Sequence, residues 1–116
     1  MTAEEVLRAE FAAEDGSFLL QLRTDLTWDT AAFDRLTTAM LEVLRTTEYA
    51  DQIPRWVAEG FWLLDTFVRD WSSHPDFPRP LPVEYYSAAY ARLHDLAQWL
   101  FVGESPYQET RVDDDA

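Results

Sequence analysis

The sequence 53-IPRWVAEGFWLLDTFVRDWSSHPDF-77 decides the fold of this chain. It contains three of the five tryptophans and three of the seven phenylalanines. Its large apolar residues recur at helical spacing, and Pro54 suits the first turn of a helix because the N–H that proline lacks would have no partner there. The apolar residues cover a wide arc of this helix. We therefore predict that it contacts neighbours on more than one side and lies at the centre of the fold.

One tryptophan departs from this arc. At about 100° per residue, Trp62 projects into the middle of the polar face of the helix. Its neighbours there are Arg55, Glu59, Thr66 and Arg69. Because tryptophan is usually largely buried, either another part of the chain covers Trp62 or this residue belongs to a contact surface. The sequence leaves both alternatives open.

Three further residues of this stretch carry structural expectations. Gly60 would let another helix approach closely, at a cost of about 1 kcal/mol in helix propensity relative to alanine. Asp65 borders the apolar arc, and we expect it to form an ion pair with Arg69, one turn later. His74 follows the helix, and we expect it to bond the helix C-terminus, where a cation is favourable.

The chain before this stretch is also predicted to be helical. Residues 2–5, Thr-Ala-Glu-Glu, fit a capping box that starts a first helix at Thr2, and Gly16 is suited to end that helix. Residues 17–26 have apolar side chains four residues apart. No second strand-like run could pair with them, so we predict a second helix there.

Longer amphipathic segments flank the central stretch. One is predicted as a helix capped by Thr27 or Asp29 and running to about Thr47, with its apolar residues on one continuous face. The other is predicted over residues 82–102, and Gly103 is suited to end it. The connector before this last helix favours an extended loop because of its prolines, which are Pro75, Pro78, Pro80 and Pro82.

Together these segments predict an all-α fold. We expect a compact bundle of four to five mostly antiparallel helices with a Pro-rich interhelical loop. The length of 116 residues suits one domain with its own core. We assign residues 1–112 to a single helical domain and residues 113–116 to a mobile acidic tail.

Charge is the strongest overall feature of the sequence. The chain has 22 acidic residues against nine basic ones, all of them arginine, and a formal net charge of −13. A field of this sign repels phosphates, so we predict no direct nucleic-acid binding, and it speeds encounter with a basic protein. No apolar run is long enough to span a membrane, and the acidic N-terminus is unlike a secretory signal. We expect a cytoplasmic protein from a GC-rich bacterial genome, without membrane contact.

The residue types that are missing exclude several chemistries. Without cysteine the chain can form no disulfide, thiolate metal site or cysteine nucleophile. Without lysine it can form no Schiff base and no P-loop. Its three glycines are scattered and make no phosphate-binding loop. We therefore predict no cofactor, no metal site and no enzymatic activity.

The histidines provide little evidence for catalysis. His94 and Asp95 form the dipeptide found in phosphohydrolases of the HD type, with His74 upstream. Two adjacent residues recur by chance, and neither histidine has a metal-ligand partner at helical spacing. Asp65 could serve acid–base chemistry, but a structural ion pair is the commoner role of such a carboxylate.

The leading functional hypothesis is a small, non-enzymatic, acidic protein-interaction domain. Exposed tryptophan, tyrosine and arginine are enriched at contact surfaces. A sharper version is a domain that neutralises a basic protein, as immunity proteins and inhibitors do. The residues that we predict to make the contact are Trp62, Arg55, Glu59, Arg69, Trp99 and Tyr85.

Two alternatives remain open from the sequence. One is a ligand-binding helical bundle, or a small hydrolase that uses His94 with Asp95, or Asp65. The aromatic residues that would line its pocket are Trp56, Trp71, Tyr86 and Tyr90, with His94 or Asp65 as the polar anchor. The other alternative is a homo-oligomeric structural protein, in which the exposed aromatic residues would form a homodimer contact.

Overall fold

The computed structural model describes residues 1–47, 49 and 51–107. Over these residues the chain forms five α-helices and no strand, so the predicted all-α fold is confirmed. The predicted tail over residues 113–116 lies outside the described residues. The helices are α1 (Ala3–Phe11), α2 (Phe18–Thr24), α3 (Thr30–Thr46), α4 (Arg55–Ser72) and α5 (Val83–Val102).

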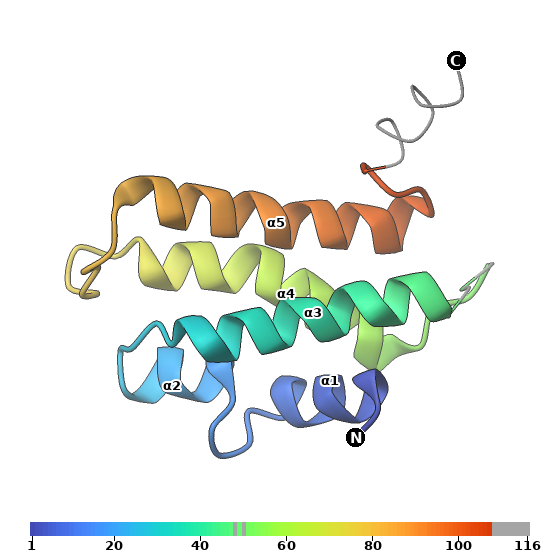
Figure 1. Ribbon diagram of the computed structural model, residues 1–116, viewed down its shortest axis with the longest axis horizontal. Helices are drawn as coiled ribbons and strands as arrows, with labels where there is room; N and C mark the ends of the chain where they lie inside the picture. Colours follow the sequence, from blue (N-terminus) through green and yellow to red (C-terminus); the bar gives the residue numbers. More distant parts are fainter. Residues whose placement is uncertain (48, 50, 108–116) are drawn as a thin grey trace.

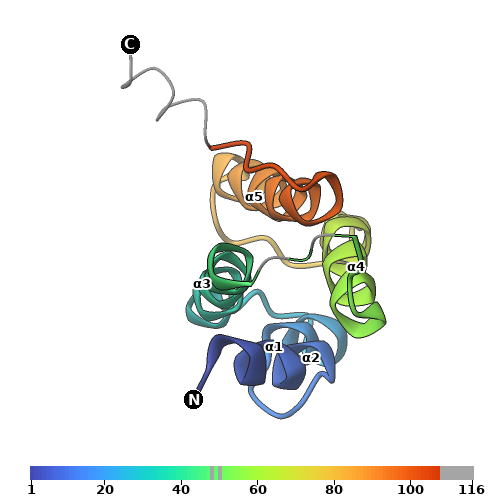
Figure 2. The ribbon, with the colours of Figure 1, turned by 90° about the vertical axis from the view of Figure 1, so that its right-hand side faces the viewer.

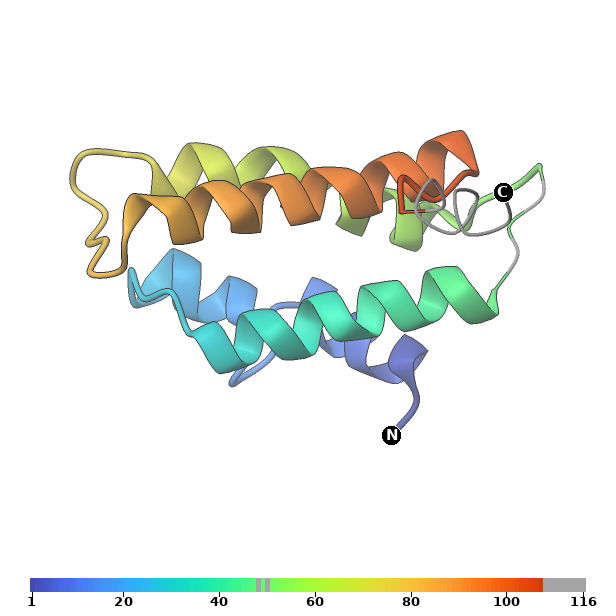
Figure 3. The same ribbon diagram turned by 45° about the horizontal axis from the view of Figure 1, so that its top comes forward.

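The three long helices form the body of the bundle. Helix α4 runs antiparallel to both α3 and α5 (Figure 1). Helices α4 and α5 lie against each other along their length (Figure 3). The short helices α1 and α2 pack on α3 and close the side of the bundle that faces away from α5 (Figure 2). No helix in the described part of the chain has the length and apolar character needed to cross a membrane.

The first helix begins as predicted but ends early. The hydroxyl of Thr2 accepts a hydrogen bond from the Glu5 backbone N–H (3.1 Å), and the Glu5 carboxylate accepts one from the Thr2 N–H (2.9 Å). This is the expected capping box. The helix ends at Phe11 and not near Gly16, because Ala13 adopts a left-handed conformation (φ 54°) that an α-helix cannot continue through.

Local side-chain caps also start α2 and α3, and both helices confirm the sequence prediction. The Ser17 hydroxyl accepts a hydrogen bond from the Leu20 N–H (3.1 Å) at the start of α2. Asp29, one of the two predicted caps of α3, accepts from the Ala32 N–H (3.0 Å). Each cap satisfies a backbone donor that the first turn of a helix would otherwise leave unpaired.

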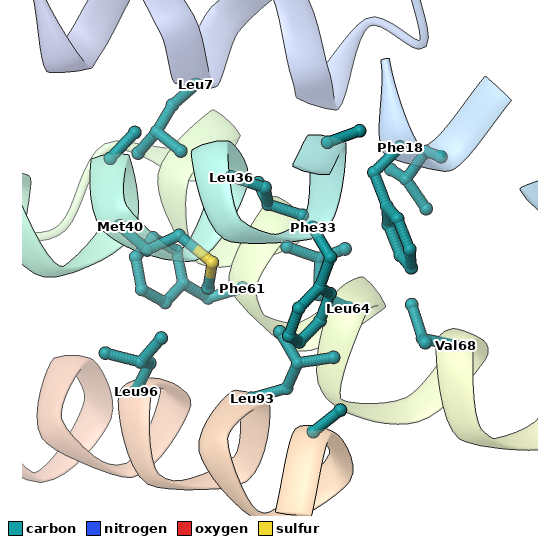
Figure 4. Packing of buried hydrophobic residues seen from close by; sticks show 14 of the residues in the cluster. Leu7, Phe18, Phe33, Leu36, Met40, Phe61, Leu64, Val68, Leu93 and Leu96 are labelled. Atoms are coloured by element: carbon teal, nitrogen blue, oxygen red, sulfur yellow. The ribbon is translucent and has the colours of Figure 1, made fainter. Parts of the chain in front are cut away.

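The core draws apolar side chains from all five helices (Figure 4). Burying each large side chain contributes roughly 1.5–3 kcal/mol relative to leaving it in water. In α4 the buried residues come mostly from the predicted apolar arc, and the helix contacts neighbours on more than one side as predicted, although it lies at an edge of the bundle and not at its centre (Figure 2). The labelled core residues are Leu7, Phe18, Phe33, Leu36, Met40, Phe61, Leu64, Val68, Leu93 and Leu96.

Trp28 is a core residue that the sequence analysis did not identify. It lies in the connection between α2 and α3, and its ring is buried against Phe18 and Tyr86, with centroid separations of 4.9 and 5.3 Å. Its indole N–H donates to the Tyr85 hydroxyl (3.0 Å). A residue outside any helix has no periodic pattern, so only the tertiary structure shows that it joins α2, α3 and α5.

Gly60 permits the close helix approach that we predicted. The ring of Phe11, at the end of α1, occupies the space where a Cβ atom at position 60 would lie. The same ring makes edge contacts with Trp56 and Phe61, at centroid separations of 6.0 and 6.1 Å. The lack of a side chain at Gly60 therefore lets α1 dock on α4.

The end of α4 is held by an arginine and not by the histidine that we expected. Arg79 Nη1 donates to the carbonyl oxygens of Ser72 (2.7 Å) and His74 (3.0 Å), next to the C-terminus of the helix. His74 Nδ1 instead accepts from the backbone N–H of Asp76 (3.1 Å). The guanidinium suits this place because it offers several donors in one plane to carbonyl groups at the negative end of the helix dipole.

Candidate functional site

The outward side of α4 carries the exposed tryptophan. The Trp62 side chain is 58 % exposed, so no described part of the chain covers it. Arg55, Glu59 and Arg69 are exposed beside it, and Thr66 is half-buried. We call these five residues the α4 outer face: Arg55, Glu59, Trp62, Thr66 and Arg69.

The packing of α4 explains why this face stays open. The helix lies at an edge of the bundle, between α5 on one side and α1 and α2 on the other (Figure 2). Its buried residues point to these neighbours and to the core. Trp62 points away from them, although the preceding residue, Phe61, is fully buried. The described residues therefore do not cover Trp62, and such cover was one of the two alternatives left by the sequence.

The charges next to this face are arranged differently from the prediction. Asp65 does not pair with Arg69 but with His94 of α5, whose Nδ1 lies 3.2 Å from Asp65 Oδ2. Asp65 lies on the side of α4 that packs against α5, so its carboxylate reaches the neighbouring helix. The Arg69 guanidinium lies 5.7 Å from the centroid of the Tyr90 ring, in a cation–π contact.

Two of the six predicted contact residues do not lie on the α4 outer face. Trp99, near the end of α5, is half-buried and makes an edge contact with Tyr107 (6.4 Å). Tyr85, at the start of α5, is half-buried beside Trp28 and accepts its indole hydrogen bond. Burial raises the pKa of the Tyr85 hydroxyl. Fourteen residues separate the two, roughly 21 Å along the helix, so they also do not form a surface with each other.

The structure does not gather the four predicted pocket aromatics around one cavity. Trp56 packs on Phe11, and the Arg8 guanidinium lies 4.1 Å from its ring centroid. Trp71 lies about four turns further along α4. Tyr86 and Tyr90 line a separate hollow beside the segment that joins α4 to α5. The Tyr90 hydroxyl is 2.6 Å from the Ser72 hydroxyl, which ties α5 to the end of α4.

A different cavity is present at the C-terminal end of α4, and the sequence analysis did not predict it. It is an open cleft of about 320 Å³ with a largely apolar lining, and we call it the α4 C-terminal cleft. Of the predicted pocket residues it contains only Trp71. It is lined by Leu26, Phe67, Asp70, Trp71, His74, Asp76 and Phe77.

The histidines and acids of the described residues show no arrangement typical of a metal centre. In the part of the chain that the structure describes, no group of three or more histidine, aspartate or glutamate side chains is placed to hold a metal ion. His94 pairs with Asp65 and not with its neighbour in the dipeptide. Asp95 lies beside Tyr107, and burial, together with the negative charge of Asp95, raises the pKa of the Tyr107 hydroxyl.

Comparison with known proteins provides no relative. No protein-family model matches the sequence, and neither a curated protein nor a solved structure matches the chain.

Proposed function

We propose that this protein is a small acidic domain that binds a basic protein through the α4 outer face. The observation that carries the proposal is the exposed indole of Trp62 among charged side chains. Tryptophan and arginine dominate the energetics of protein contacts, because a large rigid ring or a planar cation gives much contact area at small entropic cost. Such a ring at the centre of a polar surface matches the apolar centre and polar rim of an interface.

The expected energetic contribution of Trp62 is large. Its exposed part would be removed from water in a contact, which contributes on the order of 3 kcal/mol, or roughly a hundredfold in Kd. The partner would offer an apolar hollow for the ring. Arg55, Glu59 and Arg69 would surround it as the polar rim, where Glu59 would pair with a basic group of the partner and the two arginines with acidic or carbonyl groups.

The net charge supports the choice of a basic partner. A charge of −13 on a chain of 116 residues attracts a basic protein over several ångströms and repels nucleic acid. It also repels a second copy of the same chain, which disfavours a homodimer. An acidic domain that covers a basic surface would neutralise it, as an inhibitor or an immunity protein does.

The experiment is a comparative capture from a lysate of the host. Wild type, Trp62→Ala and the matched control Val83→Ala would each be immobilised, since Val83 is an exposed apolar residue at the start of α5. We expect a basic protein that wild type and Val83→Ala retain and Trp62→Ala loses. Equal capture by all three proteins would contradict the proposed surface.

The captured protein would then be purified and its affinity measured by calorimetry. We expect Kd to rise roughly a hundredfold for Trp62→Ala and to increase steeply between about 50 and about 500 mM salt. An affinity that does not change with salt would contradict the basic partner. Light scattering of the free protein provides a further test, because a stable homodimer that Trp62→Ala dissociates would assign the surface to self-association instead.

A further inference from the structure

The α4 C-terminal cleft has aromatic walls. The rings of Phe67 and Trp71 stack with a centroid separation of 5.4 Å and an interplanar angle of 24°. Phe77 is buried at the cleft, whereas Trp71 remains 39 % exposed. The cleft therefore offers ring surface to a molecule that enters from solvent. It is separate from the α4 outer face, since Phe67 and Trp71 lie on the side of α4 that faces α2.

The Trp71 ring is held in place and offers no free donor. Its indole N–H donates to the backbone carbonyl oxygen of Leu22 in α2 (2.9 Å). The part of the ring that faces solvent therefore consists of carbon atoms, and the faces of its π-system carry partial negative charge. A ligand would gain dispersion and cation–π contact from this wall, but no hydrogen bond.

Leu26 also lines the cleft, and its backbone is strained. It has φ 51°, in the left-handed region that leucine rarely adopts, and its side chain is 41 % exposed. Glycine would avoid this strain in the turn that follows α2. Strained residues of this kind are concentrated at ligand sites, where the fold holds a side chain in a position useful for binding.

The rim of the cleft is acidic. Asp70 and Asp76 are both exposed at its edge, together with His74. The nearby Arg79 guanidinium donates to the carbonyl oxygens of Ser72 and His74. Two carboxylates beside stacked aromatic rings favour a positive charge, because both carboxylates and ring faces attract cations.

We propose that the α4 C-terminal cleft binds a small organic cation with an apolar body, such as an arylalkylammonium ion. Its ring or alkyl chain would lie against Phe67, Trp71 and Leu26, and its ammonium group would lie between Asp70 and Asp76. The volume of about 320 Å³ is near the lower end of ligand pockets, so the cleft suits one ring with a short charged arm. This site does not depend on the proposed protein contact.

The test compares three ligands of one shape and different charge. Phenylethylammonium, phenylethanol and phenylacetate would be titrated separately into the full-length protein. Binding would be followed by the NMR signal of the Trp71 indole N–H, assigned with Trp71→Phe. We expect the cation to shift this signal saturably, the alcohol to bind at least about tenfold more weakly, and the anion not to bind. Equal binding of cation and alcohol would overturn the role of the carboxylates, and no saturable shift with the cation would overturn the site.

A pair of double variants separates the rim from the overall charge. Asp70→Asn with Asp76→Asn should weaken phenylethylammonium binding at least about tenfold and leave phenylethanol unaffected. Asp15→Asn with Asp51→Asn removes the same charge from two other exposed positions, and we expect a change of less than about twofold. An equal loss in both pairs would overturn the assignment to the rim. Circular dichroism would verify that each variant is folded.

Discussion

Phe61 and Trp62 are neighbours in α4, yet they lie in opposite environments. Phe61 is fully buried against Phe11 and the core, whereas Trp62 is more than half exposed. Both are large aromatic residues in one helix, so neither composition nor helix propensity separates them. Their different environments follow from the 100° turn per residue and from the neighbours that pack around α4. The difference shows that burial in the core accounts for Phe61 but not for Trp62, whose proposed role is a contact with a partner.

The largest effect is expected for Phe61→Ala. Removing a fully buried ring loses its transfer free energy and leaves a cavity, which together cost about 3–5 kcal/mol of unfolding free energy. Urea denaturation followed by circular dichroism would measure this change. A decrease in unfolding free energy of less than about 1 kcal/mol would mean that Phe61 is not a core residue, and the contrast between Phe61 and Trp62 would be wrong.

Gly60→Ala tests how closely α1 packs on α4 at the residue before Phe61. Helix propensity alone predicts a gain of about 1 kcal/mol. We expect a loss of about 1–3 kcal/mol instead, because the new methyl group overlaps the Phe11 ring and α1 must move. The control is Gly60→Ala in a Phe11→Ala background, where the substitution should no longer be destabilising. Stabilisation by Gly60→Ala in the wild-type background would contradict the close docking of α1.

Glu10 extends the comparison to a buried polar group. It is only 3 % exposed, and its carboxylate accepts hydrogen bonds from the Phe18 N–H (2.9 Å) and Arg35 Nη2 (3.5 Å). Burial raises the pKa of this carboxyl, although both partners favour the ionised form. The pKa of Glu10 is therefore higher in the folded protein than in the unfolded chain, where it is near 4.5. Protonation of Glu10 stabilises the fold fully below the unfolded pKa, and this stability is lost as pH rises through the folded pKa.

Glu10→Gln keeps the acceptor for Phe18 and removes this titration. We therefore expect the stability of Glu10→Gln relative to wild type to increase as pH rises from about 4 to about 7. Glu10→Ala should cost about 1–3 kcal/mol at both pH values, because the Phe18 N–H is left without a partner. Urea denaturation at the two pH values would measure both changes. A constant difference between wild type and Glu10→Gln would show that the pKa of Glu10 is not raised.

The smallest effect on stability is expected for Trp62→Ala. The indole is mostly in water, and alanine is the better helix former, so the unfolding free energy should change by less than about 0.5 kcal/mol. The thermal midpoint and urea curve should match those of wild type. A loss comparable to that of Phe61→Ala would show that the chain covers Trp62, and the proposed surface would lose its central residue.

Much of the fold could be predicted because its signals are local. The starts of α1, α3 and α4 follow from caps and a proline, and the end of α5 follows from Gly103. Most buried residues of α4 follow from a spacing of three and four residues. The early end of α1 could not be predicted, since alanine at position 13 has no sequence preference for a left-handed conformation. Two backbone hydrogen bonds close the helix around this residue, from the Ala13 N–H to the Glu10 carbonyl oxygen (3.0 Å) and from the Glu14 N–H to the Ala9 carbonyl oxygen (3.2 Å).

The sites were less predictable because they depend on contacts between distant residues. Four of the six predicted contact residues share the α4 outer face, since residues of one helix keep a known angular relation. Asp65 pairs with His94 of α5, 29 residues away, and Trp71 lines a cleft together with Leu26 from the turn after α2. Neither pairing has a periodic signal in the sequence.

The sequence by itself determined that this chain is helical, which side of α4 is apolar, and that Trp62 lies apart from that side. These properties depend on the 3.6-residue period and on the charge of nearby residues. Only the tertiary structure decided which helices cover α4, that Trp62 is left in water, and that Leu26 meets Phe67 and Trp71 in an open cleft. The physical reason is that burial depends on the packing of segments far apart in the chain, which no local pattern of residues specifies.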